Sequence, residues 1–365
     1  MHPLRHLHRR QRSVRRRSHE CPRRSAGRIV VHWGDLPPQP MGRRPQGGSM
    51  MGLGTGLHHL LNHPRFSVLE TLGVLMPGEV FPAFFEMEML QRALIASVLV
   101  TVVAGLFGSY LMLRNLSLIG DGLAHVSFGG VAVGVTLGSV APLWYALLFS
   151  SVASIVIYEL QSRDIVAGDT SIAIFLTGML AFGLVVLRLF GQGITTDIEG
   201  YLFGSLVLID TKSLDLIVTI CVIALAGLAV FHRGLLAITV DSVAARVQGL
   251  PVHLIGLWFS LTVAWVVVSM VQVIGALLVT ALLVTPAATG QLVGNSFRGC
   301  MMWTQAFGLA STLLGLFLSA ELNTGSGSMI ALVAAMIFAI VGLLKLASSQ
   351  LPAFDASLES EEAQG

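Results

Sequence analysis

Two ionisable side chains lie four residues apart in an otherwise apolar segment, and their types suit a metal ion. Asp121 and His125 occur in SLIGDGLAHVSFGG, and this spacing places both on one face if the segment is helical. A carboxylate oxygen and a neutral imidazole nitrogen together suit Zn²⁺, Mn²⁺ or Fe²⁺. Ionisable groups inside an apolar span are costly and are usually kept for a function. The pair is therefore a candidate metal site.

Two ligands are too few to select a metal tightly, so this pair leaves alternatives open. A two-fold homodimer would bring two aspartates and two histidines to its axis, enough for a four-coordinate ion. In the other interpretation, Asp121 caps its helix and His125 hydrogen-bonds to a neighbouring span. The spacing alone does not decide between these interpretations.

Other polar groups in the apolar region are weaker candidates. His253 begins one apolar run and His232 ends another, positions that favour an interfacial role. Asp197, Glu199 and Asp210 lie in one polar loop, where solvated acids are common. The three cysteines are far apart and define neither a disulfide framework nor a zinc knuckle.

The composition indicates a membrane protein. The chain is 54% hydrophobic and 12% charged, whereas an average soluble domain carries about 25% charged residues. Residues 86–365 hold only nine Lys and Arg and sixteen Asp and Glu, too few to cover the surface of a soluble fold. A β-barrel would alternate apolar and polar residues over about ten positions. We therefore predict an all-α, polytopic transmembrane helical bundle.

The apolar runs predict about nine spans, possibly eight, because a crossing takes about 20 apolar residues. The stretch Val252–Val293 contains 42 residues without Asp, Glu, Lys or Arg, so it must hold two helices, with a turn near Gln272–Gly275. Pro286 would break or kink the second of these helices. The predicted spans are 93–113, 121–139, 141–158, 171–190, 216–231, two within 252–293, 300–320 and 328–344.

The basic residues predict the orientation. Placing the N-terminus of the first span outside puts six basic residues in or beside cytoplasmic segments and leaves chiefly three on the other side. The opposite assignment reverses this balance, so we expect the N-terminus outside and the C-terminus inside. The cytoplasmic residues would be Arg114, Arg163, Arg233, Arg246, Arg298 and Lys345, and the external ones Arg92, Arg188 and Lys212.

Residues 1–85 have a different composition, with 13 Arg, no Lys and eight of the eleven His. They contain no apolar region followed by a small-residue cleavage site, as a secretory signal would. Translated upstream DNA of high GC content often has this composition, so we expect a true start near Met76, Met87 or Met89, and no nucleic-acid partner. The chain then divides into a basic disordered extension (1–85), a transmembrane permease domain (86–348) and an acidic cytoplasmic tail (349–365).

The longest amphipathic stretch between spans is Leu236–Pro251. It predicts a short helix on the membrane surface that ends at Gly249 and Pro251, a suitable docking element for a cytoplasmic motor. The chain has no GxxxxGK[ST] motif, so any ATPase would be a separate polypeptide. Four apolar residues recur on the stretch at helical spacing: Val243, Ala244, Val247 and Leu250.

Four segments resemble the ABC-type zinc and manganese permeases of the ABC-3 family, the membrane subunits of high-affinity metal importers. The similarity extends over about 86–346. The amino-acid sequences of the segments, their order and their spacing all agree with the family. The segments are LMLRNLSLIGDGLAHVSFGGVAVG (111–134), YLFGSLVLI (201–209), VDSVAARVQGL (240–250) and VIGALLVTALLVTPAATGQLV (273–293), with a weaker match in SAELNTGSGSMIAL (319–332).

This resemblance implies a permease like those of type II ABC importers, in a prokaryotic cell membrane. Such permeases are homodimers, each copy contacts one cytoplasmic ABC ATPase, and an extracytoplasmic binding protein delivers the metal. The chain would bind no cofactor, catalyse no reaction and pass a divalent metal along Asp121 and His125. The sequence IGDGLAHVSFG resembles the zinc members more than the manganese members, which favours Zn²⁺ over Mn²⁺ as the cargo. Fe²⁺ is a further candidate. The implied coupling element contains Asp241, Ala244, Arg246, Gly249 and Leu250.

Three other functions remain open at this point. A secondary metal transporter would need no ATPase, and inverted repeats between its halves would be expected. A type II permease for a siderophore or cobalamin would want a wide cavity and no ion-ligand pair. An intramembrane serine protease could use Ser326 as nucleophile and His125 as base, although no recognisable oxyanion arrangement accompanies them.

Overall fold

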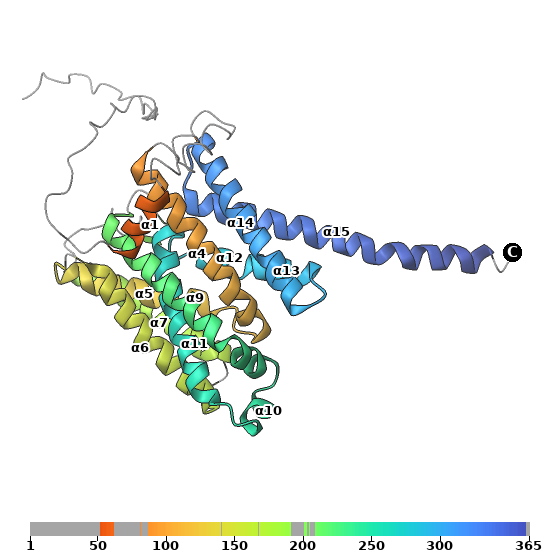
Figure 1. The fold of residues 1–365 in the computed structure, drawn as a ribbon, viewed down its shortest axis with the longest axis horizontal. Coiled ribbons are helices and arrows are strands. Elements are labelled where there is room, and N and C mark those ends of the chain that lie inside the picture. Colours follow the sequence, from red (N-terminus) through yellow and green to blue (C-terminus); the bar gives the residue numbers. More distant parts are fainter. Residues whose placement is uncertain are drawn as a thin grey trace, which may run out of the picture. The chain divides into compact units, whose positions relative to one another are not determined.

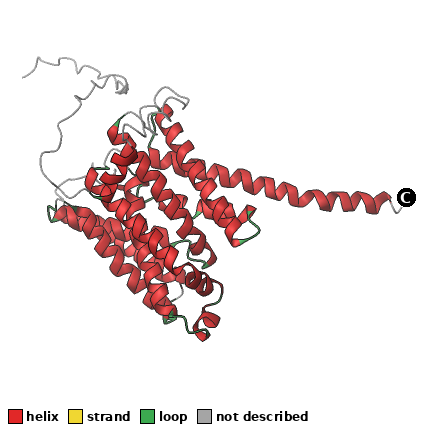
Figure 2. Cartoon of the chain, viewed as in Figure 1, coloured by secondary structure: helices red, strands yellow, loops and turns green. Residues whose placement is uncertain are grey.

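The computed structural model describes residues 52–61, 81, 87–139, 141–166, 168–190, 201–202, 204 and 209–362, and all secondary structure in these ranges is helical (Figures 1 and 2). The predicted all-α class is confirmed. The helices are α1 (Leu53–Leu61), α4 (Glu88–Leu113), α5 (Ile119–Thr136), α6 (Pro142–Ser162), α7 (Gly168–Phe190), α9 (Thr211–Val240), α10 (Ser242–Val247), α11 (Val252–Ile274), α12 (Val279–Leu283), α13 (Thr285–Val293), α14 (Phe297–Leu322) and α15 (Ser326–Glu362).

Each of the nine predicted spans contains helix, but only seven helices in the described ranges are long and apolar enough to cross a membrane. These seven are α4, α6, α7, α9, α11, α14 and α15. The two predicted spans that fall short are α5, which carries the polar candidate pair and five glycines, and the broken α12–α13 segment. The count of nine is thus approximate, and the exceptions lie around the candidate site.

The predicted turn within 252–293 is present. Helix α11 ends at Ile274, and Gly275 follows with φ +87°, a conformation that favours glycine. The returning segment is interrupted at Val284, between α12 and α13, and Pro286 lies in the first turn of α13. A proline is tolerated there because its missing N–H is not needed in the first helical turn.

Closely packed glycines allow the helices to approach one another, because packing drives helix association in lipid. A Cβ on Gly108 would lie 2.0 Å from the carbonyl oxygen of Leu283, and one on Gly130 would lie 2.6 Å from the carbonyl oxygen of Tyr145. Gly138 differs, because it has open space around it and a φ of +66° in the turn after α5. It serves the turn and not the packing.

The segment after the predicted span at 216–231 differs from expectation. The helix α9 runs on to Val240, so most of the predicted surface helix at 236–251 is divided between the end of α9 and the short α10. Asp241 separates the two helices, and its extended backbone (φ −152°) ends α9. The amphipathic pattern therefore located a helix, but its length was wrong.

Two segments outside the core of the predicted permease domain are also helical. Helix α1 contacts α9, where the Asp215 carboxylate accepts the backbone N–H of Thr55 at 2.7 Å. Its buried His58 ring lies 3.2 Å from Gln91 Oε1. At the other end, α15 continues to Glu362, through most of the predicted tail. Apart from residues 52 and 81, the rest of 1–85 lies outside the described residues, so the expected start codon stays a prediction.

Candidate metal site

Helix α5 carries both candidate ligands and is enclosed by its neighbours. It packs against α6 and α7, and also contacts α11 and α12 (Figure 1). Thirteen of its eighteen residues are buried. Asp121 is half-buried and His125 is 7% exposed. Because one chain covers most of α5 by itself, little of this helix is left for contact with a second copy, and a four-ligand site at a dimer axis stays a prediction.

Asp121 contacts a different helix and does not cap its own. The hydroxyl of Thr280, at the second position of α12, donates a hydrogen bond to Asp121 Oδ1. The N-cap position of α5 is Leu118, with no side-chain hydrogen bond. The capping interpretation of Asp121 is therefore not supported, and one carboxylate oxygen is held in place from across the bundle.

His125 has an unsatisfied ring nitrogen. Its Nδ1 is buried and has no hydrogen-bond partner within the described residues. Buried polar atoms are paired in the great majority of cases, and each exception calls for an explanation such as an absent ion or water. An imidazole nitrogen one helical turn from a carboxylate is a suitable donor for a transition metal.

The first turn of α5 lies inside the bundle. A Cβ on Gly120 would lie 2.9 Å from Leu283 Cδ2, and the backbone of Leu283 contacts Gly108 of α4. Gly108 precedes Leu113, the last residue of α4, by five positions, which is about 8 Å along a helix. The candidate ligands are therefore set back from this end of the bundle.

Three of the segments quoted for the family resemblance meet around this helix. Ser127 Oγ of α5 lies 3.0 Å from the Tyr201 hydroxyl. The carbonyls of Tyr201 and Leu202 accept the N–H groups of Ala276 and Leu277, at 3.0 and 3.1 Å. Tyr201 and Leu202 are thus tied to the turn between α11 and α12, shortly before Thr280.

Gly204 at this junction provides a test of the packing. Its φ is +77°, and a Cβ would lie 2.4 Å from the carbonyl carbon of Ile274. We expect Gly204→Ala to destabilise the protein by at least about 1–2 kcal/mol, because the conformation alone has this cost for an L-residue. Thermal unfolding of the purified chain in detergent measures the effect as a lower melting temperature.

The matched control is Gly178→Ala. Gly178 lies in helix α7, and a Cβ there would meet nothing within 4 Å. Alanine is preferred over glycine in a helix by about 0.5–1 kcal/mol, so the control is expected to melt at the same temperature or higher. Equal melting of the Gly204 variant and the wild type would contradict the packing described here.

The predicted coupling residues lie around α10. The Asp241 carboxylate caps this helix by accepting the N–H groups of Val243 and Ala244, at 2.8 and 3.0 Å. Ala244, Arg246 and Gly249 are exposed, and Leu250 is half-buried against the core.

The predicted apolar face of this segment does not face the bundle. Val243 and Val247 are 70% and 84% exposed, whereas Ala245 is buried. Helix α10 is therefore anchored by Ala245 and Leu250 and presents two valines outward.

The remaining sequence candidates do not join the site. His253 Nε2 lies 2.8 Å from Glu159 Oε1 in an exposed pair, which fits its interfacial prediction. Asp210 caps α9 by accepting the N–H of Thr211 at 2.7 Å, and 191–200, with Asp197 and Glu199, lies outside the described residues. Ser326 begins α15, and among the described residues no hydrogen bond joins it to His125.

No group of three or more His, Cys, Asp or Glu that could hold a metal occurs in the part of the chain that the structure describes. The pair Asp121 and His125, with the Thr280 hydroxyl beside it, thus offers a small set of donors. Thr280 could not be singled out from the sequence, because a threonine in an apolar helix most often bonds to its own backbone and carries no signal of its own.

The chain is similar to known proteins. The model of the ABC 3 transport family matches residues 86–345. The chain is 30% identical over 265 residues to the manganese import system permease protein ScaB of Streptococcus gordonii, covering 73% of this chain and 94% of that protein. It is 33% identical over 254 residues to the manganese transport system membrane protein MntC of Listeria innocua, covering 70% and 90%.

A solved structure is similar as well. PsaBC from Streptococcus pneumoniae, determined in complex with Fab, matches with a TM-score of 0.63 and 30% sequence identity. The match covers 72% of this chain and 95% of the matched chain. The helical arrangement described above is therefore shared with this protein over most of the transmembrane region.

Proposed function

Because this chain belongs to the ABC 3 transport family, we propose that it is the membrane-spanning permease of an ATP-driven importer for a divalent transition metal ion. The observation that carries the proposal is the pair Asp121 and His125, set inside the bundle with one ring nitrogen unpaired. The chain has the role of a transport component in the cell membrane and is not an enzyme in this proposal.

We propose Mn²⁺ as the first cargo to test. The relatives ScaB and MntC are both named as manganese proteins, and a carboxylate with an imidazole suits this ion. The preference for Zn²⁺ that the wording around Asp121 suggested stays a prediction, and a direct competition between the two ions decides it.

The small donor set suits transport more than storage. An ion that must be released to the other side has to bind weakly enough to leave, and two protein ligands leave coordination positions to water. The Thr280 hydroxyl donates a hydrogen bond to one Asp121 oxygen. A displacement of α12 would therefore change the orientation of the carboxylate that faces the ion. Alternating access would then move the same site between the two sides.

We further propose that a separate cytoplasmic ABC ATPase docks on α10 and that an extracytoplasmic binding protein delivers the ion to the opposite side. The outward valines of α10 support the first contact. We expect the N-terminus of α4 outside, as the positive-inside rule predicts. We also propose a homodimer, which cross-linking in membranes would detect.

ATP-dependent uptake in proteoliposomes tests the proposal. The vesicles contain this chain with the ATPase and binding protein encoded beside it, and either ⁵⁴Mn²⁺ or ⁶⁵Zn²⁺ outside. We expect ATP-dependent accumulation of Mn²⁺ that a tenfold excess of Mg²⁺ does not reduce, since Mg²⁺ prefers oxygen ligands and retains its water.

Two outcomes would redirect the assignment. Uptake that follows an ion gradient without ATP would indicate a secondary transporter. An intact complex that transports no free metal ion, but does transport a metal chelate, would indicate a permease for an organic ligand.

A further inference from the structure

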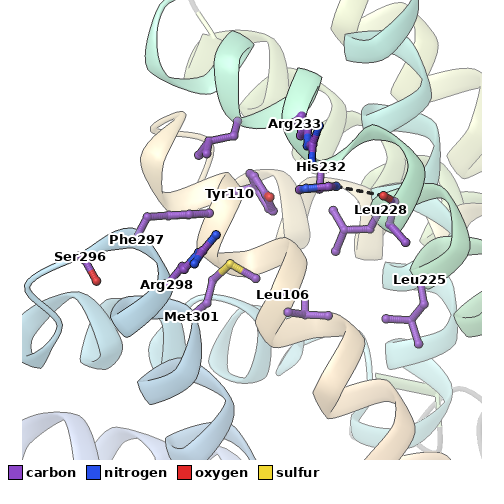
Figure 3. A pocket seen from close by; sticks show the side chains of 12 residues that line it. Leu106, Tyr110, Leu225, Leu228, His232, Arg233, Ser296, Phe297, Arg298 and Met301 are labelled. Carbon is purple, nitrogen blue, oxygen red and sulfur yellow. Dashed lines mark hydrogen bonds between the residues drawn. The ribbon is translucent and has the colours of Figure 1, made fainter.

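A pocket of about 790 Å³ opens between α4, α9 and α14, away from the candidate metal site (Figure 3). Its size lies within the 300–1,000 Å³ typical of ligand sites. It lies where the C-terminal parts of α4 and α9 meet the N-terminal end of α14. By the predicted orientation this is the cytoplasmic end of the bundle.

Two arginines and several apolar side chains line the pocket. Arg233 and Arg298 line it, and neither guanidinium has an ion-pair partner among the described residues. Among the described residues that line the pocket, none is acidic. Figure 3 shows Arg233 beside His232 at one end and Leu106 and Leu225 at the other.

The two ends are separated along the helices by the length of a lipid headgroup and the first part of a chain. Leu225 and Arg233 are eight residues apart on α9, which is about 12 Å along the helix axis. Leu225 therefore lies deeper in the span than Arg233, whereas Arg298 lies in the first turn of α14. A free inorganic anion would contact only the arginines.

Nothing local offsets the positive charge. Arg298 lies in the first turn of α14, which contains no acidic residue, and the N-terminus of a helix itself carries partial positive charge. A basic residue at this position adds to that charge. The combination favours an anionic ligand.

We propose that this pocket binds an anionic phospholipid, with the phosphate between Arg233 and Arg298 and part of an acyl chain against the leucines. Basic pockets between helices on the cytoplasmic side are a general mode of binding anionic headgroups. The bilayer supplies this ligand, and the adjoining helices α4, α9 and α14 are among the candidate spans. The lipid would fill the space between three helices that otherwise meet incompletely.

Native mass spectrometry of the full chain, purified in detergent and titrated with phosphatidylglycerol or phosphatidylcholine, tests the proposal. We expect phosphatidylglycerol to bind more tightly, and the double substitution Arg233→Gln and Arg298→Gln to weaken it about 25-fold, at about fivefold per arginine. Phosphatidylcholine binding is expected to remain unchanged. Arg163→Gln is the matched control, because Arg163 pairs with Glu159 at 3.0 Å and does not line the pocket.

A second variant separates a lipid from a small anion. Ala229 is exposed, lines the pocket and lies one turn before Arg233, so Ala229→Trp occupies the space for the chain without changing the charge. It is expected to weaken phosphatidylglycerol binding at least tenfold, and excess inorganic phosphate should not displace the lipid. All variants are compared with the wild type by gel filtration to confirm the same assembly.

Three results would overturn the proposal. Equal binding of both lipids to the wild type would remove the anionic preference. Displacement by inorganic phosphate, together with no effect of Ala229→Trp, would indicate a site for a small anion. Unchanged lipid binding in variants that lose the ATPase or the second copy on purification would assign the pocket to a protein contact.

Discussion

Asp121→Asn and His125→Gln are each expected to lower ATP-dependent Mn²⁺ uptake by about 100-fold or more. Residues that only orient a metal ligand already contribute about 10–100-fold to metal affinity or activity, so a direct ligand contributes at least as much. Asp121→Asn keeps the shape but removes the charge, and His125→Gln removes the unpaired ring nitrogen. Uptake is measured in proteoliposomes, with the same amount of assembled complex in each.

The control for this prediction is retention of the ATPase. Both substitutions lie inside the bundle, and neither changes α10, so the purified complex should keep its ATPase and its elution volume. Uptake within threefold of the wild type for both variants would place the ion path elsewhere, even though the family assignment would remain.

Thr280→Val refines the same prediction. Valine has nearly the shape of threonine but cannot donate to Asp121 Oδ1, so the carboxylate loses its orientation and keeps its charge. We expect the concentration of Mn²⁺ for half-maximal uptake to rise about tenfold. The matched control is Thr101→Val, because the Thr101 hydroxyl is buried and lies 2.8 Å from the Thr312 hydroxyl, in a pair that contains neither candidate ligand. This control should leave the half-maximal concentration unchanged.

The pair Asp121 and His125 could be predicted from the sequence because its signal is local. Two ionisable residues at helical spacing in an apolar run are conspicuous, and the segment is helical as the spacing required. The long apolar runs also predicted the membrane helices, since length and hydropathy alone determine them. The turn at Gly275 could be predicted for the same reason, because 42 residues without Asp, Glu, Lys or Arg exceed a single crossing.

Contacts between distant segments could not be predicted in this way. Thr280 is 159 residues from Asp121, and the tie between Tyr201 and Ala276 joins main-chain groups that any residue types could supply. The resemblance identified these segments as sequence motifs of the family, but it gave no reason for their proximity in the structure. The structure supplies the reason, since both flank the helix that holds the candidate ligands.

The apolar face of α10 shows a different limit. Recurring Val243 and Val247 predicted a short helix on the membrane surface, because amphipathic helices usually bury the apolar side. In the structure a single small residue, Ala245, is the buried one. A pattern of hydrophobicity indicates which face avoids water, but it does not distinguish contact within the chain from contact with a partner.

The double substitution Val243→Asp and Val247→Asp is expected to weaken binding of the ATPase by about 700-fold or more. Residues at the centre of an interface contribute about 2 kcal/mol or more each, and a carboxylate there would also lose its water. Co-purification of the two proteins and uptake in proteoliposomes measure the effect. Ser162→Asp is the control, since it adds a charge at an exposed position on the end of α6, on the same predicted side. Full co-purification of the double variant would rule out α10 as the docking element.

The double variant of Val243 and Val247 should lose ATPase binding but keep the ion site. A link between the two is therefore needed for the proposed mechanism. Helix α10 leads directly into α11, whose 23 residues form about 35 Å of continuous helix. The far end of α11 is Gly275, five residues before the hydroxyl that holds Asp121. A rigid displacement at α10 can therefore reach the carboxylate through a single stretch of chain. The purified double variant should bind Mn²⁺ at equilibrium as tightly as the wild type, while its ATP-dependent uptake is lost. The Asp121 variant should show the reverse pattern: it should retain the ATPase but fail to bind the ion.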